Sequence, residues 1–496
     1  METTDRADIR EEHYHFKASL ATVGAVKIQD SSNPYDALRA QLAPTNAEIL
    51  TPTSPGYAES IKRWSDTCEK KAAAVVRPTS ADEVSVIVKF TAAHKIPFVV
   101  CGGGHSTSCA SASEGGIVID LCKMRNVSVE PAAMTVAAEG GCTWEDVDAA
   151  AAQHGLATVG GTVNHTGVGG LTLGGGYGWL TPRHGLAIDN LLGATVVLAD
   201  GRIVTASESS HPDLFWAIRG AGASFGVVTE FLFRAHPQPN PVYAGLLIFP
   251  PSALPNIIEF VNTFHAKTDG DQGMVIALSC PPPTNAAVVI CAIFYNGPAS
   301  AGKAFFAPLL ELDPLENHIV PAMPWPLVNT MINRVSTHGG RKIFGGSSFR
   351  MPLTLDFVQA LLEKLTDFCD SHEGVGESVI ALEILSYDKV CAVSNEAMAF
   401  CNRGDYYQLG TVFKWHDPAL DEGVRVFNRE LNRWVREAGG LGKDKEEGVG
   451  VYANYIMHGA SPEEVFGRNA ARLQELKRVY DPDNLFNKWH NLIRSG

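Results

Sequence analysis

Short apolar runs alternate with helix-like segments along the first half of the chain. Residues 73–76 have the length and composition of a buried strand, and Ser80 followed three residues later by Glu83 is a capping box that begins a helix. We expect this helix to continue to about Lys95. The next apolar run, residues 97–100, predicts a second strand, and a glycine-rich loop follows it directly. The sequence therefore predicts a strand, a helix, a strand and a glycine loop in that order.

Further apolar runs predict strands as far as residue 231. The dipeptide Asp200-Gly201 separates two of them and is a strong signal for a β-hairpin. Thr143 to Asp146 are expected to begin a helix that runs through Gln153. The runs that predict these strands are residues 117–121, 135–138, 194–199, 202–205 and 226–231.

Three closely spaced prolines, Pro237, Pro239 and Pro241, mark a boundary, and beyond it strands alternate with longer helices. Residues 1–55 are polar and predict a loosely packed helical lead-in. The whole chain therefore predicts an α+β fold in two domains. The later strands are expected at residues 242–249, 274–279, 288–294 and 406–415, and the helices at residues 355–369, 420–437 and 462–479.

Composition and charge narrow the class of protein. The 496 residues carry a formal net charge of −14 and show no basic run, which argues against nucleic acid or an anionic membrane as a partner. The N-terminus has no apolar signal segment, and no stretch reaches the ~20 apolar residues of a spanning helix. The ten cysteines lack paired C-x-x-C spacing, which favours reduced thiols with at most one or two bridges. We therefore expect a cytoplasmic protein.

Two glycine-rich segments carry the candidate chemistry. The first is Cys101-Gly102-Gly103-Gly104-His105-Ser106-Thr107, and the second covers residues 160–178 and contains Tyr177. Glycine loses the most backbone freedom on folding, so such runs indicate main chain that approaches a bulky ligand. Bare N–H groups in a concavity typically bind phosphate. The alternative is that the glycines only make tight turns.

Several other functions lack their motifs. Neither glycine segment ends in the Gly-Lys-Ser/Thr of a phosphate-binding loop, and residues 220–226 precede a strand rather than the helix of a nicotinamide-binding fingerprint. A G-x-S-x-G elbow is absent, which disfavours a serine hydrolase. The 16 histidines show no H-x-x-x-H pair or His/Cys cluster in sequence, so no metal site is expected.

Several segments together resemble the vanillyl-alcohol-oxidase superfamily, and more narrowly its berberine-bridge-enzyme-like FAD oxidases. They are residues 97–106, residues 169–178, Asp189-Asn190, residues 199–201, residues 213–220 and residues 480–486. The resemblance runs from about residue 65 to the C-terminus, and only in outline over residues 240–390. It implies a split FAD-binding domain of two subdomains, residues 1–240 with a return at residues 446–496. Residues 241–445 would form the α+β substrate domain, with an antiparallel sheet.

The resemblance also implies how FAD is held. His105 matches the histidine that bonds covalently to the 8α-methyl of the flavin; the alternative is that it only hydrogen-bonds a phosphate. Relatives often add a second bond through a cysteine where this chain has Val163, so a single covalent link is expected. The C-terminal residues 487–491 depart from the pattern of relatives. The residues expected to contact the cofactor are His105, Gly102, Gly103, Gly104, Ser106, Gly161, Thr162, Gly169, Gly170, Gly174, Gly175, Gly178, Val228 and Asn491.

Tyr177 and Tyr455 match active-site tyrosines of relatives, and the alternative for both is simple packing. Some relatives carry a glutamate base on the strand at residues 406–415, where this chain has Gly410, so the carboxylate base is expected to be absent. Strand alternation places Tyr406, Gln408 and Gly410 on one face, where Gln408 or Tyr406 could contact substrate.

These features predict an FAD-dependent oxidase of a small, weakly charged and partly aromatic substrate, with dioxygen as the second reactant. A hydride would pass to flavin N5 and peroxide would form, in a tailoring step of specialised metabolism. The alternatives are a flavin dehydrogenase that reacts poorly with oxygen and a non-redox cyclase that holds FAD structurally. Neither the substrate nor the oligomeric state follows from the sequence.

Overall fold

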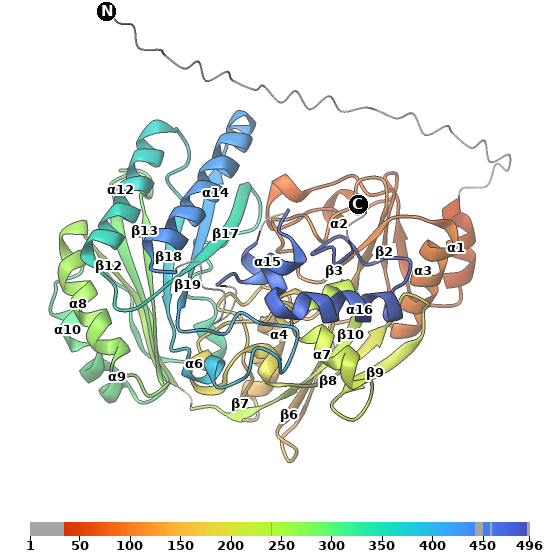
Figure 1. Ribbon diagram of the computed structural model, residues 1–496, viewed down its shortest axis with the longest axis horizontal. Helices are drawn as coiled ribbons and strands as arrows, with labels where there is room; N and C mark the ends of the chain where they lie inside the picture. The colour runs from red at the N-terminus through yellow and green to blue at the C-terminus, as the bar shows by residue number, and fades with distance from the viewer. Residues whose placement is uncertain (1–33, 240, 442–449, 457–458, 494–496) are drawn as a thin grey trace, which may run out of the picture.

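The structure is a computed structural model that describes residues 34–239, 241–441, 450–456 and 459–493. Figure 1 shows two halves side by side. One half holds residues 34–239 together with the C-terminal helices, and the other holds a large sheet covered by helices. The N-terminal part of the expected lead-in, residues 1–33, lies outside the described residues, and helix α1 (Pro34–Leu42) follows it.

The first sheet has the predicted strand–helix–strand order. Its strands are β1 (Glu48–Leu50), β2 (Ala74–Arg77), β3 (Phe98–Cys101) and β4 (Ile117–Asp120), in the spatial order β1-β2-β4-β3. Strands β2 and β3 both pair with β4 in parallel. Helix α3 (Ala81–His94) begins as expected, because the Ser80 side chain accepts a hydrogen bond from the Glu83 N–H. This unit places the first glycine segment directly after β3.

The second sheet is antiparallel, in the order β5-β6-β10-β8-β9. The hairpin at Asp200-Gly201 is confirmed: Gly201 has φ +78°, a value that glycine adopts without strain. The helix expected from Thr143 is α4 (Trp144–Ala152). The strands are β5 (Val127–Glu130), β6 (Thr135–Glu139), β8 (Leu191–Val197), β9 (Ile203–Ser207) and β10 (Val227–Arg234).

The third sheet has eight strands and forms the other half of the molecule (Figure 1). Its path is β15-β12-β14-β13-β18-β19-β17, with β16 also paired to β12, and the pairings between these strands are all antiparallel. Four of its strands, β15, β16, β17 and β18, were not predicted. The strands are β12 (Val242–Phe249), β13 (Gln272–Ser279), β14 (Val288–Tyr295), β15 (Glu316–Asn317), β16 (Val320–Met323), β17 (Arg341–Phe349), β18 (Val379–Ile384) and β19 (Tyr407–Trp415).

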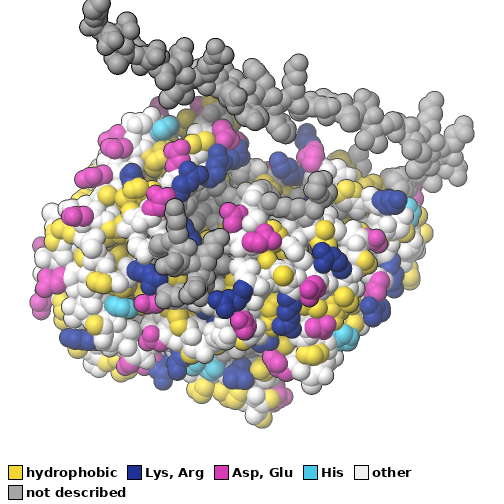
Figure 2. Space-filling view, viewed as in Figure 1, with side chains coloured by type: hydrophobic (Ala, Val, Ile, Leu, Met, Phe, Trp, Pro, Cys, Tyr) yellow, Lys and Arg dark blue, Asp and Glu magenta, His cyan; other side chains and the backbone are white. Residues whose placement is uncertain are grey.

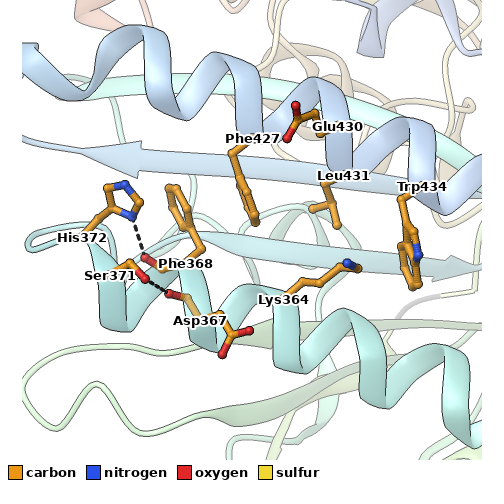
Figure 3. A pocket seen from close by; sticks show the side chains of 9 residues that line it. All are labelled: Lys364, Asp367, Phe368, Ser371, His372, Phe427, Glu430, Leu431 and Trp434. Atoms are coloured by element: carbon orange, nitrogen blue, oxygen red, sulfur yellow. Dashed lines mark hydrogen bonds between the residues drawn. The ribbon is translucent and has the colours of Figure 1, made fainter. Parts of the chain in front are cut away.

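Helices α8 (Leu254–His265), α12 (Leu355–Ser371) and α14 (Asp421–Ala438) cover the outer face of this sheet (Figure 1). Between α12 and α14 lies a groove in which Phe368 and Phe427 stack with ring centroids 4.2 Å apart (Figure 3). Thr411 Oγ1 on β19 donates a 2.7 Å hydrogen bond to Asn428 on α14. Side chains alternate along a strand, so the neighbouring Gly410 faces the opposite side, toward the other half of the molecule.

The C-terminal segment returns to the first half. One helix was expected over residues 462–479, but a 3-10 turn at Gly467–Asn469 divides it into α15 (Pro462–Phe466) and α16 (Ala470–Tyr480). The buried Lys477 ammonium donates to Asp481 at 2.6 Å and to the carbonyl of Ser224 at 2.7 Å. These bonds tie α16 to the first half. The domain limits at residues 240 and 445 stay predictions.

Acidic and basic side chains are interspersed over the face seen in Figure 2. Within the part of the chain that the structure describes, no helix has the length and apolar character needed to cross a membrane.

Candidate active site

His105 lies in a cluster of three histidines that come from distant parts of the chain. Its Nε2 lies 2.8 Å from Nδ1 of His165, and its ring stacks on Trp64 with centroids 5.4 Å apart. His338, on the loop before β17, adds a third ring 5.5 Å from His105. The sequence analysis did not detect this cluster, because the three residues are far apart in the chain.

The three imidazoles are neutral near pH 7. Burial first, and then His165 and His338, hold the pKa of His105 well below its ordinary value. Burial and His338 lower the pKa of His165 to about 4, and burial and Lys342 lower that of His338. A neutral imidazole has a free lone pair, so His105 is in the form that can act as a nucleophile or ligand. The nitrogen atoms of the three rings that could bind a metal lie within 4.8 Å of one another. The search for histidines at metal-binding spacing in the sequence did not find this group. The expected absence of a metal stays a prediction.

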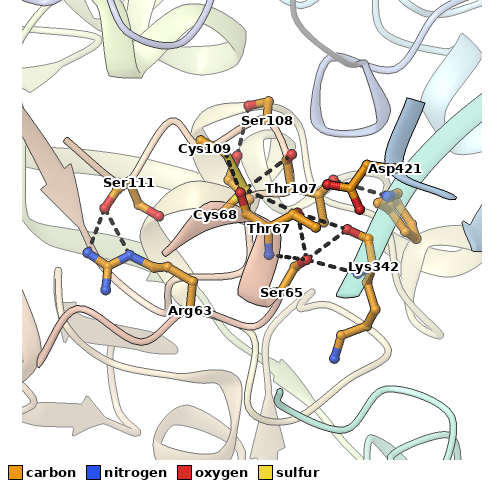
Figure 4. The surroundings of a disulfide bond; sticks show 12 residues. Arg63, Ser65, Thr67, Cys68, Thr107, Ser108, Cys109, Ser111, Lys342 and Asp421 are labelled. Carbon is orange, nitrogen blue, oxygen red and sulfur yellow. Dashed lines mark hydrogen bonds between the residues drawn. A yellow bond between two sulfur atoms is a disulfide. The ribbon is translucent and has the colours of Figure 1, made fainter. Parts of the chain in front are cut away.

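A disulfide between Cys68 and Cys109 fixes the loop that follows His105 (Figure 4). The same loop is bonded to the third sheet, because Phe344 N on β17 donates to Thr107 Oγ1 at 3.0 Å. The sequence had left one or two such bridges open, and the other eight cysteines, all among the described residues, form no disulfide. Cys109 is therefore not available to attach a flavin.

The two glycine segments meet backbone to backbone. A Cβ on Gly103 would lie 2.3 Å from Gly167 N, so both positions require glycine for close approach of the two segments. In contrast, a Cβ on Gly170 would meet nothing within 4 Å, and one on Gly169 would make only ordinary contacts. The segments thus combine positions closed by protein with open main chain near Gly169 and Gly170.

Protein neighbours explain several glycines that the sequence assigned to cofactor contact. A Cβ on Gly161 would lie 2.6 Å from Leu171, and one on Gly174 would lie 2.2 Å from the Asn454 amide. Gly175 packs on Phe400, and Gly178 on the carbonyl of Gly160. The physical reason for glycine at these four positions is packing within the protein, and their contact with a cofactor stays a prediction.

The other expected cofactor residues lie around the same segments. Gly102, Gly104, Ser106 and Thr162 are half-buried, and Ser106 Oγ lies 2.9 Å from Ser108 Oγ. Val228 is buried on β10, and its carbonyl lies beside Gly140. Asn491 accepts a 3.1 Å hydrogen bond from Asn484 in the C-terminal return.

Tyr455 forms a hydrogen bond with a carboxylate that the sequence analysis missed. Its hydroxyl donates to Glu383 Oε1 at 2.7 Å, and Glu383 lies on β18, next to β19 in the sheet. The role of Glu383 as a base stays a prediction, but the expectation that no carboxylate lies at this place is wrong. It considered only the strand that carries Gly410, whereas the carboxylate comes from the neighbouring strand. The signal was present in Val379-Ile380-Ala381-Leu382-Glu383-Ile384, a strand-like apolar run with a single acid.

The pair has the electrostatics of a proton acceptor. Burial raises the pKa of Glu383 to about 7, against a smaller lowering effect of the Tyr455 hydrogen bond. Burial, and then the Glu383 carboxylate, raise the pKa of Tyr455 well above its ordinary value. Both side chains are only half-buried, and Glu383 Oε2 has no hydrogen-bond partner among the described residues. The phenol is therefore not a base by itself, and the carboxylate is the group that can take its proton.

Two glycines make room for the Tyr455 ring on the sheet. Gly346 on β17 and Gly410 on β19 are paired, and a Cβ on Gly346 would lie 2.5 Å from Tyr455 Cδ2. A Cβ on Gly410 would lie 3.6 Å from the same ring. Phe344 meets the ring edge to face, with centroids 4.5 Å apart. The glycines and Phe344 thus fix the position of the phenol.

Other tyrosines surround this pair. The ring of Tyr452 lies 4.6 Å from that of Tyr455 and 4.5 Å from that of Tyr177, and Tyr387 lies 5.5 Å from Tyr177. Burial raises the pKa of Tyr177 well above its ordinary value, so its phenol stays protonated. Its hydroxyl has no hydrogen-bond partner within the described segments. The structure thus brings Tyr177 and Tyr455 into one aromatic cluster, and it adds Tyr452 and Tyr387.

The other two catalytic candidates lie deeper in the protein. Gln408 is fully buried, and its Oε1 accepts a 3.3 Å hydrogen bond from Ser348. The Tyr406 hydroxyl donates to Asn402 at 2.7 Å and accepts from the Gly450 N–H at 3.2 Å. The polar atom of Tyr406 is therefore engaged in structure, and catalytic roles for these two residues stay predictions.

The comparisons with known proteins agree with this geometry. A family model described as "FAD binding domain" matches residues 72–207, and one described as "Berberine and berberine like" matches residues 451–492. FAD-linked oxidoreductase pgmH of Aspergillus terreus is 38% identical over 452 residues, which cover 88% of this chain and 91% of that protein. The chain belongs to the berberine-bridge-enzyme-like FAD-linked oxidoreductases. FAD-linked oxidoreductase hasG of Aspergillus fumigatus is 32% identical over 468 residues, which cover 91% of this chain and 98% of that protein.

Solved structures of this family share the fold. 6-Hydroxy-D-nicotine oxidase from Arthrobacter nicotinovorans has a TM-score of 0.79 at 25% identity, covering 90% of this chain and 98% of that one. A berberine bridge enzyme variant in complex with (S)-reticuline has a TM-score of 0.78 at 19% identity, covering 94% of this chain and 100% of that one. The predicted fold class is thereby confirmed.

The residues of the site fit FAD, the cofactor of this family. The open main chain near Gly169 and Gly170 can approach a diphosphate, and the neutral His105 lies on the first glycine segment. Buried polar atoms without partners in the described chain, among them Thr172 Oγ1 and Tyr177 Oη, lie in or next to the second segment. Such atoms are costly to leave unpaired, so a bound group is expected beside them.

Proposed function

We propose that this oxidoreductase is an oxidase of a small organic alcohol or amine, in which Tyr455 and Glu383 take the proton while a hydride leaves the adjacent carbon. The observation that carries the proposal is the 2.7 Å hydrogen bond from Tyr455 to Glu383. FAD would supply the hydride acceptor at N5, and dioxygen would restore it with release of hydrogen peroxide.

The chain's own residues handle the proton. A substrate hydroxyl donates to Tyr455 Oη, and as its proton moves to the phenol, the phenol proton moves to Glu383 Oε1. No free phenolate is needed, because the second transfer follows the hydrogen bond that already joins the phenol to Glu383. Gly346, Gly410 and Phe344 keep the ring in place during this step.

The surroundings support a flat and weakly charged substrate. Tyr177, Tyr387, Tyr452 and Phe344 offer aromatic surface around the pair, with phenol tips for polar groups. We also retain the proposals of a tailoring role in specialised metabolism and of a cytoplasmic location.

The first test separates the oxidase from its rivals. When purified enzyme is mixed anaerobically with alcohols, sugars, phenolics and alkaloids, we expect at least one compound to bleach the flavin absorption. Admission of air should then restore the colour in seconds and release one peroxide per flavin. Bleaching with slow reoxidation would indicate the dehydrogenase, and turnover without bleaching would indicate the non-redox cyclase.

The second test concerns attachment of the cofactor. We propose one covalent link, through His105, because the imidazole is neutral and Val163 stands at the position of the second link. After acid precipitation the flavin colour should stay with the wild-type pellet and leave with the supernatant in His105→Ala, whose activity falls without vanishing. His184→Ala, which changes a histidine stacked on His236, is the control and should keep its flavin. A colourless wild-type pellet would refute the covalent link.

A further inference from the structure

His165 holds one particular nitrogen of His105. The bond joins His105 Nε2 to His165 Nδ1 at 2.8 Å, so Nδ1 of His105 is the nitrogen left for another partner. A 180° flip of the His105 ring would keep its stacking on Trp64 but would lose this hydrogen bond. Such a contact determines which nitrogen carries the proton, because one imidazole must donate and the other must accept.

The direction of this hydrogen bond follows from what attachment requires. For Nδ1 of His105 to present a lone pair, the ring proton of His105 must lie on Nε2, and Nδ1 of His165 must accept it. The neutral His165 ring then carries its own proton on Nε2, and its Nδ1 can receive the proton of His105.

The backbone on both sides of His165 is fixed. Asn164 N donates to the carbonyl of Asn329 at 2.8 Å, and Asn333 donates to the Asn164 side chain at the same distance, 2.8 Å. Thr166 N donates to the carbonyl of Val163 at 3.1 Å. The position of the His165 ring is therefore set by the protein before any ligand binds, as a positioning role requires.

We propose that His165 is the positioning residue for flavin attachment: it holds the Nε2 proton of His105, so that Nδ1 of His105 bonds the flavin. The inference rests on the proposed covalent link. In the step, a bond forms between His105 Nδ1 and the 8α-carbon, and one C–H bond of that methyl group breaks. The Nε2 proton of His105 leaves through His165. FAD is itself the oxidant: its ring gains two electrons and two protons, and dioxygen removes them again as hydrogen peroxide.

The chemistry explains why a histidine is useful at this position. Alkylation of Nδ1 produces a cationic ring unless the Nε2 proton leaves, and the burial of His105 beside Lys342 makes a cation costly here. His165 accepts that proton and is itself half-buried, so the proton can continue to solvent. An asparagine in its place could still accept the hydrogen bond, but it could not take the proton.

The test follows attachment rather than turnover. Flavin-free protein from riboflavin-starved cells is mixed with FAD, and the covalent fraction is measured over time by acid precipitation. We expect the rate to fall by about 10²-fold in His165→Ala, the scale of general acid–base catalysis. Flavinyl peptide labelled with ¹⁵N-histidine then shows by NMR which nitrogen is alkylated. Wild type and His165→Asn should give Nδ1, with His165→Asn attaching slowly, and His165→Ala should give a mixture of Nδ1 and Nε2.

Three outcomes overturn the inference. Attachment at Nε2 in wild type contradicts the assigned nitrogen, and full attachment at the wild-type rate in His165→Ala contradicts the positioning role. Wild type without any covalent flavin removes the proposed link and the inference with it, which the acid-precipitation step shows before any variant is made. His338→Ala removes the third ring without touching the His105–His165 bond, so it serves as the control and should still give Nδ1.

Discussion

Glu383→Gln and Tyr455→Phe are each expected to slow flavin reduction by substrate by about 10²–10⁴-fold. Both changes break the same proton path, because the Tyr455 hydroxyl donates directly to Glu383. The double variant should therefore be little slower than the slower single variant, since residues that act as a unit are not additive. Rapid mixing under anaerobic conditions measures the rate at saturating substrate.

The pH dependence provides an independent readout of the same pair. The pKa of Glu383 is about 7, so the carboxylate that accepts the proton is present above that pH and lost below it. The reduction rate of the wild type should rise as pH increases through about 7 and then level off. In Glu383→Gln this limb should disappear. A wild-type profile that is flat from pH 5 to 9 would remove Glu383 from the proton path.

Stability measurements test whether a slow variant is slow only because it is destabilised. The folded-state pKa of Glu383 lies above the unfolded value of about 4.3, so ionisation of this carboxyl at higher pH disfavours the folded state. Glutamine removes that cost, and the Tm of Glu383→Gln at pH 8 should equal or exceed that of wild type. Tyr407→Phe is a matched tyrosine control, because its hydroxyl meets His265 on α8 and not Glu383. It should keep the wild-type reduction rate.

Local patterns in the sequence predicted the first half of the fold well. Ser80 caps α3 as expected, and Asp200-Gly201 forms the expected hairpin, because both signals depend on a few neighbouring residues. The same reasoning failed for the helix over residues 462–479, where a 3-10 turn at Gly467–Asn469 interrupts a continuous helical pattern. Local signals thus identify where elements begin better than they detect a break inside one.

The site was only half predictable, for a physical reason. His105, Tyr177 and Tyr455 lie in recognisable motifs, whereas Glu383 and His338 reach the site only through long-range contacts. Glu383 becomes a partner of Tyr455 because β18 lies beside β19. The order of strands in an antiparallel sheet cannot be predicted from the sequence of either strand alone. The sequence therefore identified the tyrosine, and only the sheet order placed a carboxylate beside it.

The second large effect is expected from the substitution Gly346→Ala, although Gly346 has no side chain that could take part in the reaction. A Cβ there would lie 2.5 Å from Tyr455 Cδ2 and 2.8 Å from the backbone carbonyl of Leu409. The β-strand carbonyl cannot yield easily, so the methyl group of Gly346→Ala must push the Tyr455 ring away from its place on the sheet. A misplacement of about 1 Å can cost about 10²-fold in rate, and we expect flavin reduction to slow by that factor.

Gly410→Ala is the matched control, because it adds the same methyl group beside the same ring. A Cβ on Gly410 would lie 3.6 Å from Tyr455 and Phe344, which is ordinary contact, so its rate should stay within a few-fold of wild type. The larger Gly410→Leu should again be slow, since its branched side chain needs the space that the ring occupies. The visible flavin spectrum and the Tm should show that all three variants are folded and loaded. If Gly346→Ala reduces its flavin as fast as Gly410→Ala does, the Tyr455 ring does not rest on Gly346 during the reaction, and its hydrogen bond to Glu383 is not what sets the rate.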